Sequence, residues 1–288
     1  MVSASRRDRV GRVATGRRLD HNAFGRRAIS HARSGRIGQD TMRRILPLLI
    51  VLAAMPAAAR AAGDPSRDVL WAALKTCILA KKLADRTFPC LDVDLGGRDR
   101  PGTAVLRAPG EPTHIVVMPT DTVAGLEAPA LRGARGTAYW RAALAARHFV
   151  SDSLKGRVPV EEIGMAVNSA RGRSQDQLHI HLDCMKSRVL AALRTHGHGI
   201  RATWAHFPVA LAGDRYFALR VPAAEIERFN PFAVLHRLPG RRPDLRETSF
   251  AALATPAGDP EPGFYVLAYR APRASAEDLM DHTCAASG

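Results

Sequence analysis

Two histidines and an aspartate alternate with apolar residues between Gln177 and Asp183. The segment reads Gln-Leu-His-Ile-His-Leu-Asp, and this period of two predicts a β-strand with one apolar face and one chemical face. His179 and His181 share the chemical face with Gln177 and Asp183. Imidazoles and a carboxylate arranged in this way can attack phosphorus, carry a proton or bind a metal.

The residues before this strand predict the other half of a β-hairpin. A strand over 164–168 ends at Asn168, and a turn containing Gly172 follows it. The connecting loop would place Arg173, Ser174 and free backbone N–H groups near the imidazoles. Such donors can cradle an anion, so the hairpin predicts phosphate chemistry carried by a nucleophilic histidine.

Two other interpretations of the same residues are a metal site and a polar, solvent-facing strand. His179, His181 and Asp183 are all possible zinc ligands. Neighbours on one strand face lie about 6.6 Å apart, so two imidazoles can converge on one ion but a third ligand from that strand strains the geometry. The nucleophile interpretation is preferred because it also gives roles to Asn168 and Ser174.

The elements that must position this hairpin alternate between strands and flanking helices, which predicts an α+β fold with an antiparallel sheet. The connection 121–136 is long and polar, as binding loops often are. Periodicity predicts helices over 65–85, 137–154, 186–196 and 274–284, short helices over 222–228 and 230–235, and further strands over 102–106, 113–118, 203–211, 216–221, 250–254 and 264–268.

The formal charge of +15 is concentrated at the amino terminus of the 288-residue chain. Residues 1–44 contain twelve Arg and three Asp, so they carry 12 − 3 = +9 of the total. The rest of the chain has no basic stripe interleaved with aromatic residues, which argues against a nucleic-acid partner.

An apolar run over 45–59, preceded by Met42 and two arginines and followed by small residues, has the order of a bacterial export signal. Cleavage after Ala59 or Ala61 would fit, and a retained signal anchor is the second choice. We therefore expect 1–41 to be a mis-annotated extension or an unstructured basic tail, 42–62 a signal peptide or signal anchor, and 63–288 a single domain with a C-terminal extension.

The chain has four cysteines, all after the apolar run, and an even number in an exported protein suggests two disulfides. Three pairings are possible, and free thiols are the alternative. Cys77 and Cys90 are close in sequence and could join the first helix to the next segment, which leaves Cys184 with Cys284.

The stretch from Asn168 to Cys184 resembles the active-site hairpin of the histidine triad (HIT) superfamily, in which Asn and a Gly/Ser loop precede a strand of alternating histidines. More closely, 66–286 resembles the bacterial CDP-diacylglycerol pyrophosphatase family. The marks are Met-Pro-Thr at 118–120, the hairpin itself, the tail Arg-Ala-Ser-Ala-Glu at 273–277 with Asp-His-Thr-Cys at 281–284, and the positions of the cysteines.

The resemblance implies a HIT-like sheet and hydrolysis of CDP-diacylglycerol to phosphatidate and CMP without a metal or other cofactor. It implies that His179 is the nucleophile, that His181 contacts the phosphate or orients His179, and that Asn168 and Ser174 hold the nucleophile and the phosphate. Arg173 would stabilise phosphate charge. Gln177 replaces the first histidine and can bind the substrate by hydrogen bonds but cannot titrate.

The lipid substrate implies a membrane lipid surface as partner and a location on the periplasmic side of the inner membrane. A soluble periplasmic nucleotide hydrolase or transferase with the same nucleophile, and a metal-binding His-x-His-x-Asp protein, are the alternatives. His196, His198 and His282 are expected to be loop or helix-end residues outside the site.

Overall fold

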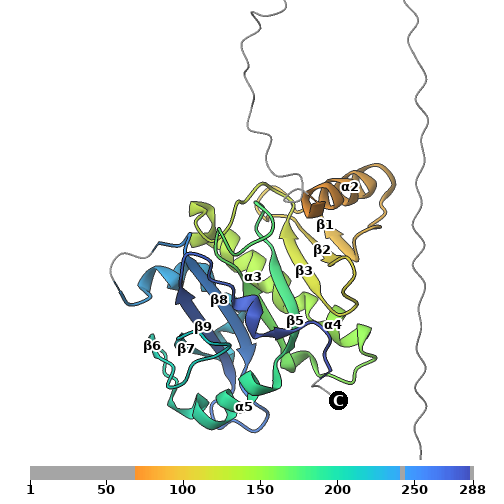
Figure 1. Cartoon of the computed structure of the whole chain (residues 1–288). Helices are drawn as coiled ribbons and strands as arrows, with labels where there is room; N and C mark the ends of the chain where they lie inside the picture. Colours follow the sequence, from red (N-terminus) through yellow and green to blue (C-terminus); the bar gives the residue numbers. More distant parts are fainter. Residues whose placement is uncertain (1–68, 241–243, 286–288) are drawn as a thin grey trace, which may run out of the picture. The chain divides into compact units, whose positions relative to one another are not determined.

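An antiparallel sheet carries the predicted hairpin near its middle (Figure 1). The structure, a computed structural model, describes residues 69–240 and 244–285. Within them ten strands pair in the order β1-β2-β3-β5-β4-β8-β9-β7-β6, and β10 pairs with β5 outside that path. The strands are β1 (Asp92–Asp94), β2 (Thr103–Arg107), β3 (Ile115–Pro119), β4 (Ile163–Val167), β5 (Ile180–Met185), β6 (Ala205–His206), β7 (Phe217–Pro222), β8 (Thr248–Ala254), β9 (Gly263–Arg270) and β10 (Met280–Asp281).

The predicted β-hairpin is formed by β4 and β5. Their antiparallel register places Ala166 opposite His181 and Gly164 opposite Asp183. On its other side β5 pairs with β3, where Val116 lies opposite His181. Both strands are buried along their whole length, which explains the nearly continuous apolar sequence of β3.

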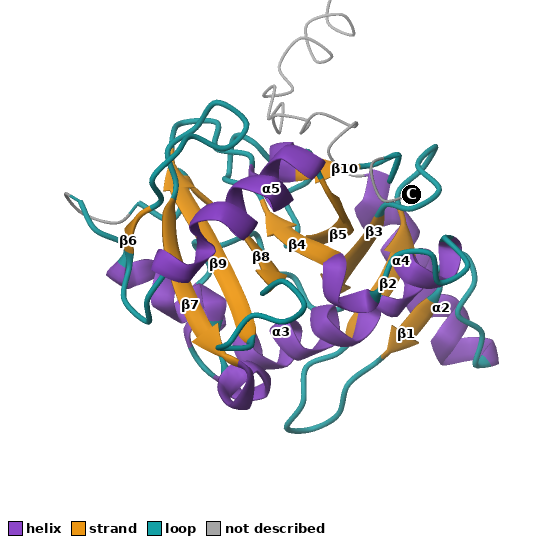
Figure 2. Cartoon of the chain, turned by 90° about the horizontal axis from the view of Figure 1, so that it is seen from below, coloured by secondary structure: helices purple, strands orange, loops and turns teal. Residues whose placement is uncertain are grey.

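Helices cover both faces of the sheet, and Figure 2 shows α5 and α3 on opposite sides of it. The α3 face buries Ile180 and Leu182 of β5. The other face carries His181, because paired residues on neighbouring strands point to the same side. There, α2 packs on a cluster with Val116, and α5 packs on a cluster with Ala166. The helices are α2 (Val69–Ala84), α3 (Ala134–Ala146), α4 (His148–Ser153), α5 (Ser187–His196) and α6 (Pro231–Val234).

The α+β class is confirmed, and most predicted elements lie within a few residues of those observed. The predicted helix 137–154 is two helices, α3 and α4, and the connection 121–136 contains the 3₁₀ turn Pro129–Arg132 and the start of α3. The predicted strand 203–211 is wrong, because only Ala205–His206 pair with β7. The segments 222–228 and 230–235 hold the 3₁₀ helix Ala223–Arg228 and α6.

The predicted C-terminal helix 274–284 is also wrong. The segment forms a 3₁₀ turn, Ala276–Leu279, followed by β10. Its backbone N–H groups bond to the rest of the protein: Ser275 donates to the hydroxyl of Tyr269 and Ala276 to that of Ser249. Met280 and Asp281 then pair with the end of β5. These contacts satisfy the backbone in place of an α-helical ladder.

The predicted export segment over 42–62 and the extension over 1–41 lie outside the described residues. In the part of the chain that the structure describes, no helix has both the length and the apolar character required to cross a bilayer.

Candidate active site

His179 directly precedes β5 and is 3% exposed. Its Nδ1 lies 2.7 Å from the carbonyl oxygen of Gln177, so Nδ1 carries the hydrogen and donates it. Its Nε2 is buried and has no hydrogen-bond partner among the described residues. Burial lowers the pKa of His179, which favours the neutral ring with a lone pair on Nε2.

A small pocket beside His179 collects most of the residues predicted for the site. It is lined by Gly125, Val167, Asn168, Arg173, Gln177, Leu178 and His179. A Cβ at Gly125 would lie 2.1 Å from Nη1 of Arg173, so a larger residue there would displace the guanidinium. Ser174 is exposed and is not part of this lining.

The guanidinium of Arg173 is already engaged by two carboxylates. Its Nη1 and Nη2 donate to Glu127 at 3.0 and 2.9 Å, and Nε and Nη2 donate to Asp176 at 3.3 and 3.1 Å. Since a guanidinium has five N–H donors, one hydrogen on Nη1 is left over by these bonds. Arg173 therefore offers a phosphate one donor and a partly compensated charge.

The side chain of Gln177 holds the loop after β3. Its amide oxygen accepts from Val123 N at 3.0 Å, and its amide nitrogen donates to the carbonyls of Pro119 and Asp121 at 3.0 and 2.7 Å. Both of its donor hydrogens are thereby used. Gln177 thus positions the site through its backbone carbonyl and this loop, and the bonds leave no donor for the substrate.

His181 lies behind His179, with the two ring centroids 4.7 Å apart. Its Nδ1 is 2.8 Å from Nε2 of His114 and 3.2 Å from Oε1 of Glu277. Its Nε2 is 3.5 Å from the amide nitrogen of Asn168. Burial lowers the pKa of His181 well below its ordinary value, so the ring is neutral at pH 7.

Glu277, from the C-terminal segment, connects the buried polar groups. Its Oε2 accepts from the amide of Asn168 at 2.7 Å, and its backbone N–H donates to the amide oxygen of Asn168 at 3.2 Å. Its Oε1 also lies 3.4 Å from Nε2 of His282. Burial alone would raise the pKa of Glu277, but the neighbouring imidazoles and these hydrogen bonds outweigh burial and lower it.

His282 belongs to this cluster, so its predicted place outside the site is wrong. Nδ1 of His282 donates to Asp183 at 2.9 Å, and its ring stacks on that of His114 with centroids 4.3 Å apart. Hydrogen bonds to Asp183 and Glu277 raise the pKa of His282 to about 10. His282 is therefore a cation held between two carboxylates.

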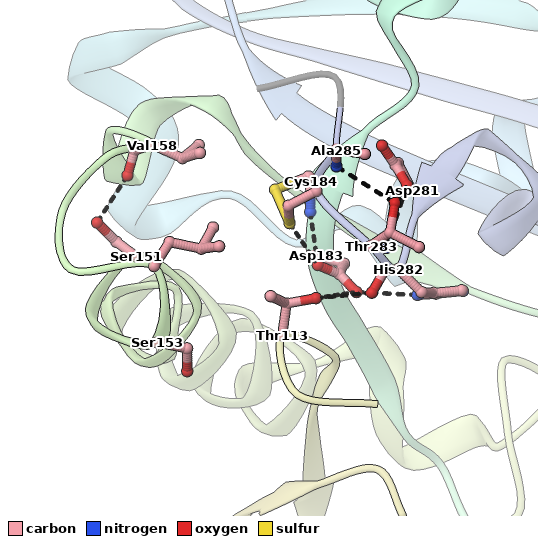
Figure 3. Close-up of a disulfide and its surroundings, with 12 residues drawn as sticks. Thr113, Ser151, Ser153, Val158, Asp183, Cys184, Asp281, His282, Thr283 and Ala285 are labelled. Atoms are coloured by element: carbon pink, nitrogen blue, oxygen red, sulfur yellow. Dashed lines mark hydrogen bonds and ion pairs between the residues drawn. A yellow bond between two sulfur atoms is a disulfide. The ribbon is translucent and has the colours of Figure 1, made fainter. Parts of the chain in front are cut away.

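A disulfide between Cys184 and Cys284 fixes this end of the chain beside β5 (Figure 3). The hydroxyl of Thr113 donates to the carbonyl of His282 at 2.9 Å and also lies 3.4 Å from the carboxylate of Asp183. A second disulfide joins Cys77 to Cys90, so both predicted pairings are present.

The other two histidines predicted to lie outside the site do so. The ring of His196 packs edge-on against Phe207, and His198 is exposed.

The ligand atoms that come together are not the predicted set of His179, His181 and Asp183. Among the described residues, the groups with three possible ligand atoms within 4.8 Å are His114 with His181 and Glu277, Glu111 with His114 and His282, and Asp183 with the two cysteines of a disulfide. Oxidised cysteines offer no thiolate. The first set offers imidazoles and a carboxylate that can hold a cation, whereas in the second His282 is itself protonated and has no lone pair to donate. His179 belongs to neither set.

Sequence analysis missed His114, and it did not assign Glu277 to the site. His114 directly precedes β3 and has no spacing relation to the histidine strand, so its contact with His181 depends on the pairing of β3 with β5. Glu277 and His282 do lie in the tail that carried the family resemblance. The tail was therefore the sequence feature that could have assigned Glu277 and His282 to the site.

Comparison with known proteins identifies the family of the chain. A family model described as CDP-diacylglycerol pyrophosphatase matches residues 65–288. A CDP-diacylglycerol pyrophosphatase of Yersinia pestis is 33% identical over 249 residues, which cover 84% of this chain and 93% of that protein. One from Mycobacterium bovis is 29% identical over 225 residues, covering 77% and 84% of the two chains. The chain therefore belongs to the CDP-diacylglycerol pyrophosphatase family.

Proposed function

We propose that this protein hydrolyses the pyrophosphate bond of CDP-diacylglycerol to phosphatidate and CMP, with Nε2 of His179 as the nucleophile. The observation that carries the proposal is the state of this imidazole. One nitrogen is fixed by a backbone carbonyl, and the other is buried beside a pocket with no partner among the described residues. A neutral, oriented imidazole of this kind is prepared for attack on phosphorus.

In the first step, the Nε2 lone pair attacks the phosphorus on the cytidine side. A P–N bond forms, and the P–O bond to phosphatidate breaks, so the electron pair leaves with the phosphatidate oxygen. The ring keeps its Nδ1 hydrogen, and the positive charge that it gains is stabilised by the Gln177 carbonyl.

In the second step, water attacks the same phosphorus. The P–N bond breaks, CMP is released with the water oxygen, the proton from water passes to solvent, and His179 returns to its neutral form. The second pKa of a phosphate monoester is about 6, so phosphatidate can leave without receiving a proton. Gln177 at the first triad position, which cannot donate an acidic proton, is compatible with this leaving group.

The remaining predicted residues have supporting roles. Asn168 lies between the pocket and Glu277, and the leftover hydrogen on Nη1 of Arg173 can meet a phosphate oxygen. We assign Ser174 to the phosphate on the family resemblance alone. The acyl chains of the substrate remain in the bilayer, so we place the enzyme at the periplasmic side of the bacterial inner membrane.

An isotope experiment tests the point of attack. Turnover in oxygen-18 water should place the label in CMP and none in phosphatidate. Quenching in base should retain a cytidylyl group on the peptide containing His179, because phosphoramidates survive base better than acid. Label in phosphatidate would exclude attack at the cytidine-side phosphorus.

Variants and substrates separate the alternatives. His179→Ala should lose turnover and the adduct together, whereas activity should survive EDTA. Loss of activity in EDTA with no adduct would favour a cation at His114, His181 and Glu277 and attack by water. Equal rates on a soluble CDP-alcohol and on CDP-diacylglycerol would instead favour a soluble nucleotide hydrolase.

A further inference from the structure

The outer surface of α2 exposes large apolar side chains beside its lysines. The described part of the chain has six exposed large hydrophobic residues, and four of them lie in α2 or in the loop after it. These are Val69 (54% exposed), Leu79 (57%), Leu83 (78%) and Phe88 (82%). Concentration of exposed apolar side chains in one place marks an interaction surface, whereas scattered ones need no explanation.

Helical spacing places Leu79 and Leu83 on one side of α2, in line with two smaller residues. Ala72, Thr76, Leu79 and Leu83 are separated by four, three and four residues, so they form one stripe along the helix. The opposite face is already used, since Leu74 and Cys77 are fully buried against the sheet. The helix therefore has large apolar residues on two faces. The sheet covers one of them, and the face with Leu79 and Leu83 is exposed.

Basic residues border the exposed stripe. Lys75 and Lys82 are exposed on the same side of α2, and Arg86 follows its end. Lys81 forms an ion pair with Asp85, and the ammonium of Lys75 lies 5.1 Å from the centroid of the Trp71 ring, within the same helix. The exposed Lys82 and Arg86 have no ion pair among the described residues. An apolar stripe flanked by lysines fits a membrane interface, where aliphatic chains enter the acyl boundary and ammonium groups reach anionic headgroups.

The sequence before α2 also favours a position near a membrane. The apolar run over 45–59 ends ten residues before Val69. Ten residues span at most about 36 Å when fully extended. Whenever that run is inserted in a bilayer, α2 is kept within this distance of its end.

We infer that the stripe of α2 and Phe88 dock on an anionic phospholipid surface, with Lys75, Lys82 and Arg86 on the headgroups. The inference rests on the part of the proposed function that places the protein at a membrane, and it is independent of the nucleophile. It also places the sheet face that carries His181 one helix layer from the lipid. The inner face of α2 packs on Val116, and Val116 pairs across the strands with His181.

Site-specific photo-crosslinking in the full chain tests the docking surface. A benzoylphenylalanine placed at Leu83 or Phe88 should form lipid adducts in vesicles of phosphatidylcholine with phosphatidylglycerol. The same probe at Val209, which is 38% exposed elsewhere on the protein, should form none. Insertion of the 45–59 run would also keep α2 near the bilayer, so the charge variants below separate docking of α2 from that insertion.

Charge variants provide the matched comparison. Lys75→Gln with Lys82→Gln should lower the adduct yield at Leu83, and so should vesicles of phosphatidylcholine alone. Lys155→Gln with Arg215→Gln removes the same charge from exposed positions outside α2 and should leave the yield unchanged.

Three results would overturn the inference: adducts between two copies of the chain, adducts to residues 1–68, or equal lipid adducts at Val209. Any of them, combined with normal release of CMP, would reject the docking surface and leave the proposed hydrolysis standing. Loss of CMP release with lipid adducts intact would reject the proposed hydrolysis and leave the docking surface standing.

Discussion

The pH dependence expected of a nucleophilic His179 follows from its burial. Burial lowers its pKa from the ordinary 6.5, so the attacking neutral form persists to lower pH than in an exposed imidazole. We expect the acid limb of kcat/KM on a soluble CDP-alcohol to lie below about pH 6.5. A pH–rate profile recorded without lipid measures the position of this acid limb. An acid limb above that value would contradict a buried, neutral nucleophile.

His282 should make stability depend on pH in the alkaline range. Its pKa is raised from 6.5 to about 10, so its contribution is complete below about pH 6.5 and is lost as the pH rises through about 10. The difference in unfolding free energy between the wild type and His282→Gln should therefore be largest near pH 6 and shrink towards pH 10. Urea titrations at several pH values measure this difference. The exposed His198→Gln provides the control, and a difference independent of pH would refute the charge assignment.

Alanine variants of Gln177 and Ser174 should separate effects on stability from effects on phosphate binding. Gln177→Ala leaves one N–H and two carbonyls of the loop after β3 without their partner, at a cost of about 1–3 kcal/mol for each group that stays buried. Ser174→Ala removes an exposed hydroxyl and should leave the unfolding free energy unchanged. A fall in turnover in Ser174→Ala, measured beside its denaturation curve, would support its role at the phosphate. Unchanged turnover would remove Ser174 from the site.

At the scale of elements, the C-terminal segment is held by the disulfide from Cys184 to Cys284, which are separated by 100 residues in sequence. Closing a loop of this size contributes about 4–5 kcal/mol in the chain-entropy model. Cys184→Ser with Cys284→Ser should lower both stability and turnover, because Glu277 and His282 would no longer be fixed beside His181. Melting curves and CMP release measure the two effects.

The other disulfide supplies the control for that prediction. Cys77→Ser with Cys90→Ser opens a loop with a separation of 13 residues between α2 and the segment after it, and it leaves Glu277 and His282 fixed by the other disulfide. This pair should lose stability but keep turnover of a soluble CDP-alcohol. Equal losses of turnover in both double variants would show that the C-terminal segment has no special role in the site.

The sequence predicted the elements whose signals are local. Alternating side chains revealed β5, and its apolar face is indeed buried against α3. The C-terminal segment was predicted as a helix because its local composition permits one, whereas Tyr269, Ser249 and β5 offer its backbone better partners. Those partners become neighbours only when the sheet forms. His114 escaped prediction for the same reason, since strand pairing brings it to His181.

At the scale of the whole molecule, one prediction concerns the amino terminus. Met42 begins a segment with the full order of an export signal, while residues 1–41 add charge without an apolar period. We expect a chain that starts at Met42 to be exported and to release CMP as the full chain does. Cell fractionation and activity measurements check this expectation. Loss of export on removing 1–41 would show that the basic segment has a targeting role.

The two halves of the disulfide between Cys184 and Cys284 are synthesised 100 residues apart. Translation begins at the amino terminus, so His179 and its pocket exist well before the residues that complete their surroundings. Glu277, His282 and Cys284 lie within the final dozen residues of the chain. A polypeptide that ends before residue 277 thus contains His179, the proposed nucleophile, but lacks Glu277 and His282. In such a polypeptide Cys184 also lacks its disulfide partner.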